Sequence, residues 1–231
     1  MPSRGTIQRP RVLATLDATA GSRLVLVVAG PGYGKTTVLT QWAWANRTAW
    51  ISVLPKDRGF GGMARALLRA LDALSPGIEV ELRPVVASWS PEIGSHEAAW
   101  ALVDLLNDVL GREPGHLSLI VDDASELAQQ DTAWDLLDAL VRQTPAGLRV
   151  LIGSRTQPPI PTQRLRARGE LSEIDVASLA FERREVEQLL CSHVGDVDGS
   201  LIARVFDLTQ GSPGCGAPGC RFARPRAFRR A

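Results

Sequence analysis

The stretch from Val27 to Thr37, VVAGPGYGKTT, places glycine, lysine and hydroxyl side chains within a few positions of one another. Gly30, Gly32 and Gly34 let the backbone curl, so that several amide N–H groups can point inward and form a nest for an anion. Lys35 adds a mobile positive charge for outer phosphates, and a threonine hydroxyl after it can hold magnesium. The stretch therefore predicts a phosphate-binding loop.

The loop predicts which residues contact a nucleotide. We expect the phosphates to lie against Gly30, Gly32, Tyr33, Gly34, Lys35, Thr36 and Thr37. Within this set Thr36 is the expected magnesium ligand, and Lys35 also has a catalytic role because its ammonium group would neutralise phosphate charge. The strict pattern has glycine where this chain has Ala29, although alanine is small. The alternative is an ordinary glycine-rich turn, but the order of strand, loop, lysine, hydroxyls and helix favours the phosphate loop.

Two carboxylates follow another buried segment. Asp122 and Asp123 come directly after the apolar run LSLIV, which ends at Val121. If that run is a parallel strand, Asp122 lies at the same sheet edge as the phosphate loop and binds magnesium through water. Asp123 is then placed to orient or deprotonate an attacking water. The alternative is that both aspartates cap the following helix.

A guanidinium group ends a further apolar run. Arg155 follows LRVLIGS, residues 148–154. If this strand lies beside the first one, Arg155 points at the terminal phosphate and senses its presence, which is a nucleotide-binding and catalytic role. The alternative is a solvated arginine in a loop.

Hydrophobic periodicity indicates the elements that must position these groups. Uninterrupted aliphatic runs predict strands, and apolar residues at helical spacing predict helices. The expected strands are 24–29, 48–53, 117–121, 148–154 and 171–176, and the expected helices are 11–18, 36–46, 63–74, 97–110, 134–143, 183–191 and 200–209. Because strands and helices alternate, we expect an α/β fold, a P-loop NTPase with a five-stranded parallel sheet flanked by helices. The course of the loop before residue 97 is not predicted.

Composition bounds the class of protein. The 231 residues include 26 basic and 25 acidic side chains, and 45% are hydrophobic. This balance indicates a globular protein and argues against direct DNA binding by charge alone. No apolar run is long enough to span a bilayer and the amino end lacks a secretion signal, so a cytoplasmic location without membrane contact is expected. Three cysteines predict no disulfide framework.

The same patterns divide the chain into four parts. We expect an amino-terminal extension with a short helix over 1–22, a nucleotide-binding domain over 23–178 and a partial helical subdomain over 179–213. Residues 214–231 are rich in Gly, Ala, Pro and Arg without periodicity, which is typical of a disordered tail.

Taken together, the motifs resemble the ATP-binding domain of the STAND class of signal-transduction ATPases. The resemblance rests on the APGYGKT loop, the WISV strand, IVDD, LRVLIGSR, the LAF step before an acidic helix, and TQGSP. The chain is most similar to the large ATP-binding LuxR-type transcriptional regulators, the maltose-activator group, from Arg9 to Pro213.

This resemblance implies a signal-gated switch that rests with ADP and self-associates with ATP. It implies ATP/ADP and Mg²⁺ as cofactors, with slow Mg-dependent hydrolysis. It implies that Pro213, in a Gly-x-Pro step, packs near adenine, and that Arg9 to Arg11 also lie near the base. The chain departs from the family at Ser212, where relatives usually have tryptophan.

The resemblance stops at Pro213, whereas relatives continue into a sensor and a helix-turn-helix that reads DNA. The tail composition is that of a GC-rich gene read out of frame. We therefore expect a truncated or frameshifted product without direct DNA binding.

Three other functions are compatible with the phosphate loop. One is an AAA-like ATPase acting on nucleic acid, for which Arg164, Arg166 or Arg168 could serve a neighbouring subunit. Another is a small-molecule phosphotransferase, although no arginine-rich lid follows the third strand. The last is a nucleotide-stabilised scaffold without turnover, so enzymatic activity is left open at this point.

Overall fold

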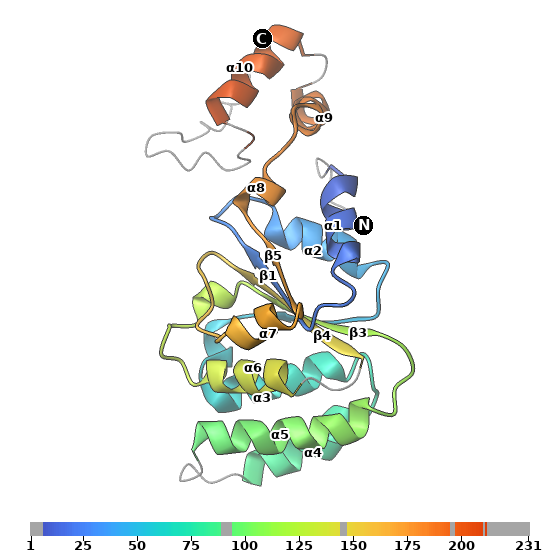
Figure 1. The fold of residues 1–231 in the computed structure, drawn as a ribbon, viewed down its shortest axis with the longest axis vertical. Coiled ribbons are helices and arrows are strands. Elements are labelled where there is room, and N and C mark those ends of the chain that lie inside the picture. Colours follow the sequence, from blue (N-terminus) through green and yellow to red (C-terminus); the bar gives the residue numbers. More distant parts are fainter. Residues whose placement is uncertain (1–6, 89–93, 144–146, 195–196, 210, 212–231) are drawn as a thin grey trace, which may run out of the picture.

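The computed structural model describes residues 7–88, 94–143, 147–194, 197–209 and 211. Its centre is a five-stranded parallel sheet with the strand order β2-β3-β4-β1-β5 (Figure 1). The strands are β1 (Leu24–Val28), β2 (Thr48–Ser52), β3 (Leu117–Asp122), β4 (Leu148–Ser154) and β5 (Leu171–Ile174). The predicted α/β class and parallel sheet are thus confirmed.

Residues of β1 show why the sheet is covered on both faces. Leu24 and Leu26 contribute to one hydrophobic core, and Val25 and Val27 contribute to another on the opposite face. Successive side chains of a strand point to opposite faces, so a continuous aliphatic run can be buried only between two layers of helices.

Helices supply those layers. They are α1 (Pro10–Ala18), α2 (Lys35–Ala43), α3 (Gly59–Leu71), α4 (Ile78–Ser88), α5 (Ser95–Leu110), α6 (Ala133–Arg142), α7 (Gln163–Ala167), α8 (Val176–Leu179), α9 (Arg183–Val194) and α10 (Gly199–Thr209), with short 3₁₀ helices η1 (Pro55–Asp57) and η2 (Ala124–Glu126). Helices α1 and α2 cover one face, α3 and α6 cover the other, and α4 and α5 form a further layer outside them (Figure 1).

The strand order brings the predicted site residues to one edge. Strand β4 lies between β3 and β1, with Val28 paired to Ser154, as expected from the sequence. The phosphate loop therefore begins beside the end of β4, where Arg155 follows. Asp122 ends β3 at the same carboxyl edge, because all the strands are parallel.

The helices α4, α7 and α8 were not predicted from the sequence, and the ends of several other elements are shifted by a few residues. The fifth strand ends at Ile174, and the expected strand residue Val176 instead begins α8, because Asp175 caps that helix by accepting the amide N–H of Ser178 at 2.8 Å. Helix α4 occupies the loop of unpredicted course. It contains Pro84, which disfavours helix in sequence reasoning, but its tertiary contacts with α3 outweigh this cost.

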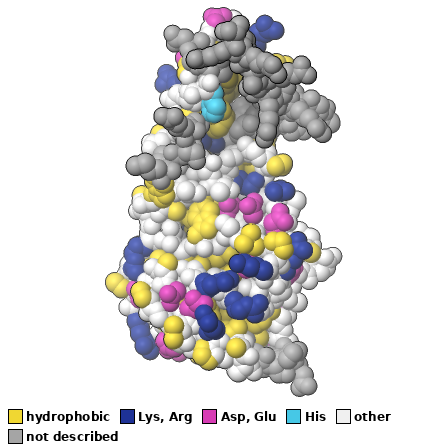
Figure 2. All heavy atoms as spheres, turned by 180° about the vertical axis from the view of Figure 1, so that it is seen from behind, with side chains coloured by type: hydrophobic (Ala, Val, Ile, Leu, Met, Phe, Trp, Pro, Cys, Tyr) yellow, Lys and Arg dark blue, Asp and Glu magenta, His cyan; other side chains and the backbone are white. Residues whose placement is uncertain are grey.

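Helices α9 and α10 pack on each other and stand apart from the sheet, to which α8 connects them (Figure 1). Among the described residues, none of the helices combines the length and apolar character that crossing a bilayer requires. On the face shown in Figure 2, basic side chains lie among acidic and hydrophobic ones, in keeping with the near-neutral total charge. Pro213 and the predicted tail over 214–231 lie outside the described residues.

Candidate phosphate and magnesium site

The loop after β1 has the backbone conformation that its glycines predict. Gly32 has a φ of 83° and Gly34 a φ of 74°, in the left-handed region that glycine adopts without penalty. Gly34 is also the residue that caps the amino end of α2, so the first amides of α2 border the loop. Ala29 does not have a positive φ, and its amide donates to the carbonyl of Ser154 at 3.2 Å. Its departure from the strict glycine pattern therefore fits the loop geometry.

Lys35 opens α2 and turns its side chain back onto the loop. Its Nζ donates to the carbonyl oxygens of Ala29 at 2.7 Å and Gly30 at 2.9 Å, and the residue is only 8% exposed. Burial lowers the pKa of Lys35, an effect that Asp122 opposes and Arg155 reinforces. An ammonium group in such a position is poorly solvated and gains from an incoming anion.

Thr36 and Asp122 form the contact between α2 and β3. The hydroxyl of Thr36 donates to Asp122 Oδ2 at 2.6 Å, although the two residues are 86 positions apart in the chain. Asp122 is buried, and its other carboxylate oxygen, Oδ1, has no hydrogen-bond partner. Burial raises the pKa of Asp122, while the hydrogen bond from Thr36 lowers it.

These two residues fit a magnesium ion. Mg²⁺ prefers oxygen ligands and is usually held by one or two protein groups together with phosphate oxygens and waters. The exposed hydroxyl of Thr36 and the unpartnered Oδ1 of Asp122 supply such oxygens beside the phosphate loop. When bound, the ion would neutralise phosphate charge.

Asp123 has an unusual backbone conformation next to this pair. Its φ is 55°, a positive value that is uncommon for a residue other than glycine. It precedes η2, but its side chain makes no capping hydrogen bond. Helix α6 begins after Thr132, and the amide of its first residue, Ala133, donates to Asp131 at 2.9 Å. The helix-capping alternative is therefore not supported for Asp123, which is half-buried and close enough to Lys35 to raise the pKa of that ammonium group.

Arg155 lies at the end of β4 with a half-exposed side chain. Its Nη2 is 3.8 Å from Glu126 Oε1, a long and exposed ion pair. Such a pair is worth little, so the guanidinium can turn toward a phosphate at small cost. Its charge already lowers the pKa of Lys35, which places it within electrostatic reach of the loop.

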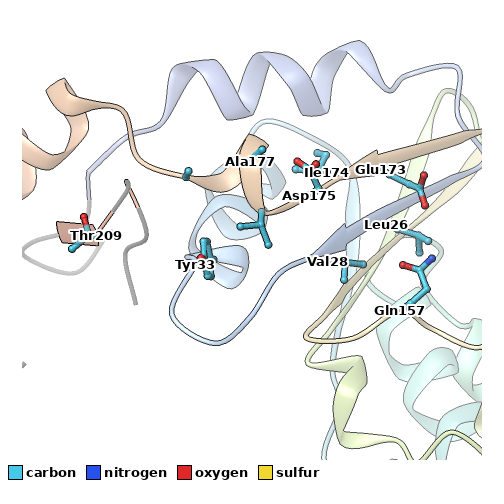
Figure 3. Close-up of a pocket in the computed structure, with 11 residues that line it drawn as sticks. Leu26, Val28, Tyr33, Gln157, Glu173, Ile174, Asp175, Ala177 and Thr209 are labelled. Atoms are coloured by element: carbon cyan, nitrogen blue, oxygen red, sulfur yellow. The ribbon is translucent and has the colours of Figure 1, made fainter. Parts of the chain in front are cut away.

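A pocket of about 750 Å³ opens beside the phosphate loop (Figure 3). Its walls come from the ends of β1 and β5, from Tyr33 in the loop, from α8, and from Thr209 at the end of α10. Sequence reasoning found Tyr33 but missed the wall residues Val176, Ala177, Ala180 and Thr209. Small or apolar side chains carry no chemical signal, and only their position after β5 and at the end of α10 could have suggested them.

Comparison with known proteins agrees with this geometry. No protein-family model matches the chain. The chain is 32% identical over 211 residues to the HTH-type transcriptional regulator MalT of Serratia proteamaculans, and 29% identical over 213 residues to MalT of Yersinia pestis. Each alignment covers 90% of the chain, and the chain spans 23% of the length of either regulator.

Solved structures give the fold. A STAND protein with a tetratricopeptide repeat sensor from Pyrococcus horikoshii superposes with a TM-score of 0.62 at 16% identity, covering 90% of this chain and 28% of that one. A Walker-type ATPase of Pyrococcus abyssi superposes with a TM-score of 0.53 at 13% identity, covering 90% and 65%. The chain has the fold of a STAND P-loop domain and is related to the MalT regulators. The resemblance seen in the sequence motifs is thereby confirmed.

Of the predicted site residues, the structure brings together the loop, Lys35, Thr36, Asp122 and Arg155 at one sheet edge. Thr37 follows in the first turn of α2. Pro213 lies outside the described residues.

Proposed function

We propose that the chain binds ATP and ADP with Mg²⁺ and hydrolyses ATP slowly, as the nucleotide switch domain of a MalT-like transcriptional regulator. The observation that carries this proposal is the contact between Thr36 and Asp122, which leaves Oδ1 buried and unpartnered beside the phosphate loop. A buried acceptor without a partner is costly, and a divalent cation would satisfy it.

The charges and the pocket support the same proposal. Phosphates would lie over the loop, between the ammonium group of Lys35 and the guanidinium of Arg155. The nucleoside would enter the neighbouring pocket, whose lining includes Tyr33 and Thr209. Asp123 would orient the attacking water. ATP-dependent self-association, which the resemblance to the STAND class implies, stays a prediction. Light scattering of the chain in ADP and in ATP would test it.

Calorimetry on Lys35→Met tests the proposal. Methionine keeps the length of the side chain but removes the charge, so two charge-assisted contacts of about 1.5–3 kcal/mol each are lost. The sum of about 3–6 kcal/mol corresponds to a fall in ADP affinity of roughly 10²- to 10⁴-fold with Mg²⁺ present. Lys56→Met is the matched control, because Lys56 is exposed on η1.

The wild-type chain should bind ADP and release phosphate from ATP slowly. Unchanged ADP affinity in Lys35→Met would exclude the phosphate loop as the site. Binding without any phosphate release would leave a nucleotide-stabilised scaffold, and acceleration by an added acceptor would indicate a phosphotransferase.

A further inference from the structure

Arg9 carries a charge that the nucleotide site does not use. The residue is 2% exposed, and its Nε and Nη2 donate to the two carboxylate oxygens of Glu185 at 3.1 and 3.2 Å. Its Nη1 donates to the carbonyl of Leu179 at 2.9 Å, and Nη2 also donates to that of Ala180 at 3.0 Å. The guanidinium carbon lies 4.4 Å from the centre of the Phe181 ring. Because these partners accept from all three guanidinium nitrogens and Phe181 covers one face of the group, Arg9 would have to give up contacts in order to reach a base.

This network ties together three distant parts of the chain. Arg9 precedes α1, and its partners lie between α8 and the first turn of α9, up to 176 positions away. Phe181 extends the network to the end of α10, since its amide donates to the carbonyl of Gly211 at 2.6 Å. We call Arg9, Leu179, Ala180, Phe181, Glu185 and Gly211 the cross-tie.

Gly211 makes the cross-tie sensitive to shape as well as charge. Its φ is 71°, and a Cβ added there would lie 2.3 Å from the carbonyl oxygen of Phe181. A side chain at this position would therefore separate the end of α10 from the segment that Arg9 holds.

The cross-tie borders the pocket on the side away from the sheet. Ala180, whose carbonyl accepts from Arg9, lines the pocket, and so does Thr209, two residues before Gly211 (Figure 3). Another side of the pocket is formed by β1 and the phosphate loop, and within the described part of the chain Arg9 makes no hydrogen bond to either of them. Helices α9 and α10 pack chiefly on each other. Among the described residues, the cross-tie attaches them beside the pocket together with Arg11, which donates to the carbonyl of Ala180 at 2.8 Å and pairs with Glu182 at 2.9 Å.

We propose that Arg9 is a positioning residue, which holds the α9–α10 side of the pocket against the phosphate-loop side. It thereby sets the affinity for the nucleoside part of the ligand without contacting it. The phosphate loop sets the affinity for the phosphates. This inference rests on the proposed function, because it assigns the pocket to the nucleoside of the same nucleotide.

Arg9→Lys is the decisive variant, because lysine keeps the charge but cannot form the planar fork that reaches a carboxylate and two carbonyls together. Calorimetry should show ADP affinity about tenfold weaker, while affinity for inorganic tripolyphosphate stays within about twofold of wild type, both with Mg²⁺. Glu185→Gln should show the same split. Arg83→Lys is the matched control, since Arg83 forms an exposed i,i+4 pair with Glu79 on α4.

Hydrogen exchange provides a readout that needs no nucleotide. In Arg9→Lys, amides of α9 and α10 should exchange faster, while those of β1 and β4 keep their wild-type rates. If Arg9→Lys does not fold, Gly211→Ala replaces it, and the same two readouts apply because the clash opens the cross-tie from its other end.

The outcomes separate the two proposals. A wild-type chain that binds neither ADP nor tripolyphosphate contradicts the proposed function, and exchange then still tests the cross-tie. Equal losses for ADP and tripolyphosphate, unchanged ADP affinity, or unchanged exchange in α9 and α10 would each overturn the positioning role.

Discussion

Replacing Asp122 by asparagine should make the ligand-free protein more stable and less responsive to magnesium. The carboxylate is 1% exposed, one of its oxygens has no partner, and burial raises its pKa. Asparagine has nearly the same shape and keeps an oxygen that can accept the hydroxyl of Thr36, but it carries no charge. The variant thus removes the cost of burying the charge together with the oxygen that would hold the ion.

We expect the free energy of unfolding to rise by about 1 kcal/mol at neutral pH, within the range of about 0.5–2 kcal/mol that is typical of single stabilising substitutions. For a chain of this size, 1 kcal/mol corresponds to a rise of roughly 2–4 °C in Tm. The hydrogen bond from Thr36 and the charge of Lys35 both lower the pKa of Asp122, which keeps the expected gain at this modest size.

The pH dependence has a definite sign. Since the folded pKa of Asp122 is raised, its protonated form stabilises the fold below the unfolded pKa of about 3.9, and this contribution is lost as the pH rises through the folded pKa. The stability difference between Asp122→Asn and wild type should therefore be small in acid and reach its full size at neutral pH. Groups that do not interact with Asp122 contribute equally to both proteins and cancel in the difference.

Thermal unfolding in EDTA at several pH values measures the stability, and calorimetry with ADP in Mg²⁺ or EDTA measures the metal dependence. In Asp122→Asn the ADP affinity should be nearly the same in both buffers. Asp104→Asn, an exposed acid on α5, is the control for charge alone. A variant that is less stable at neutral pH and still binds ADP more tightly with Mg²⁺ would refute this reasoning.

Two further substitutions test the neighbouring groups. Asp123→Gly should stabilise the fold by about 1 kcal/mol, because glycine adopts the observed φ of 55° without strain. It should also slow phosphate release at least tenfold, which corresponds to an activation free energy raised by roughly 1.4 kcal/mol, and lower thermal stability or unchanged turnover would contradict it. Arg155→Ala should weaken ATP binding about tenfold more than ADP binding, since the guanidinium would meet the terminal phosphate; equal losses in a competition assay would show that it does not sense that group.

Local patterns were enough to predict the strands and the chemistry of the loop. The aliphatic run of β1 must be buried on both faces, and the glycines that follow it need a positive φ wherever the backbone turns sharply. Asp122 was predicted from its residue type and from its position directly after the apolar run LSLIV, and it ends β3. Helix α4 was missed because Pro84 disfavours a helix locally. The packing of α4 on α3 stabilises it, and such packing between two helices cannot be seen in the local sequence pattern.

The sequence alone determined which groups can hold phosphate and metal. For the phosphate loop this is so because residue type and spacing along one loop suffice to form an anion nest. Only the tertiary structure decided which of them meet. The contact of Thr36 with Asp122 spans 86 positions and depends on β4 lying between β3 and β1. The burial of Arg9 against Glu185 depends on bringing α1 to the first turn of α9. Such contacts join segments with no local relation in the chain, so their energies depend on the packing of the whole fold.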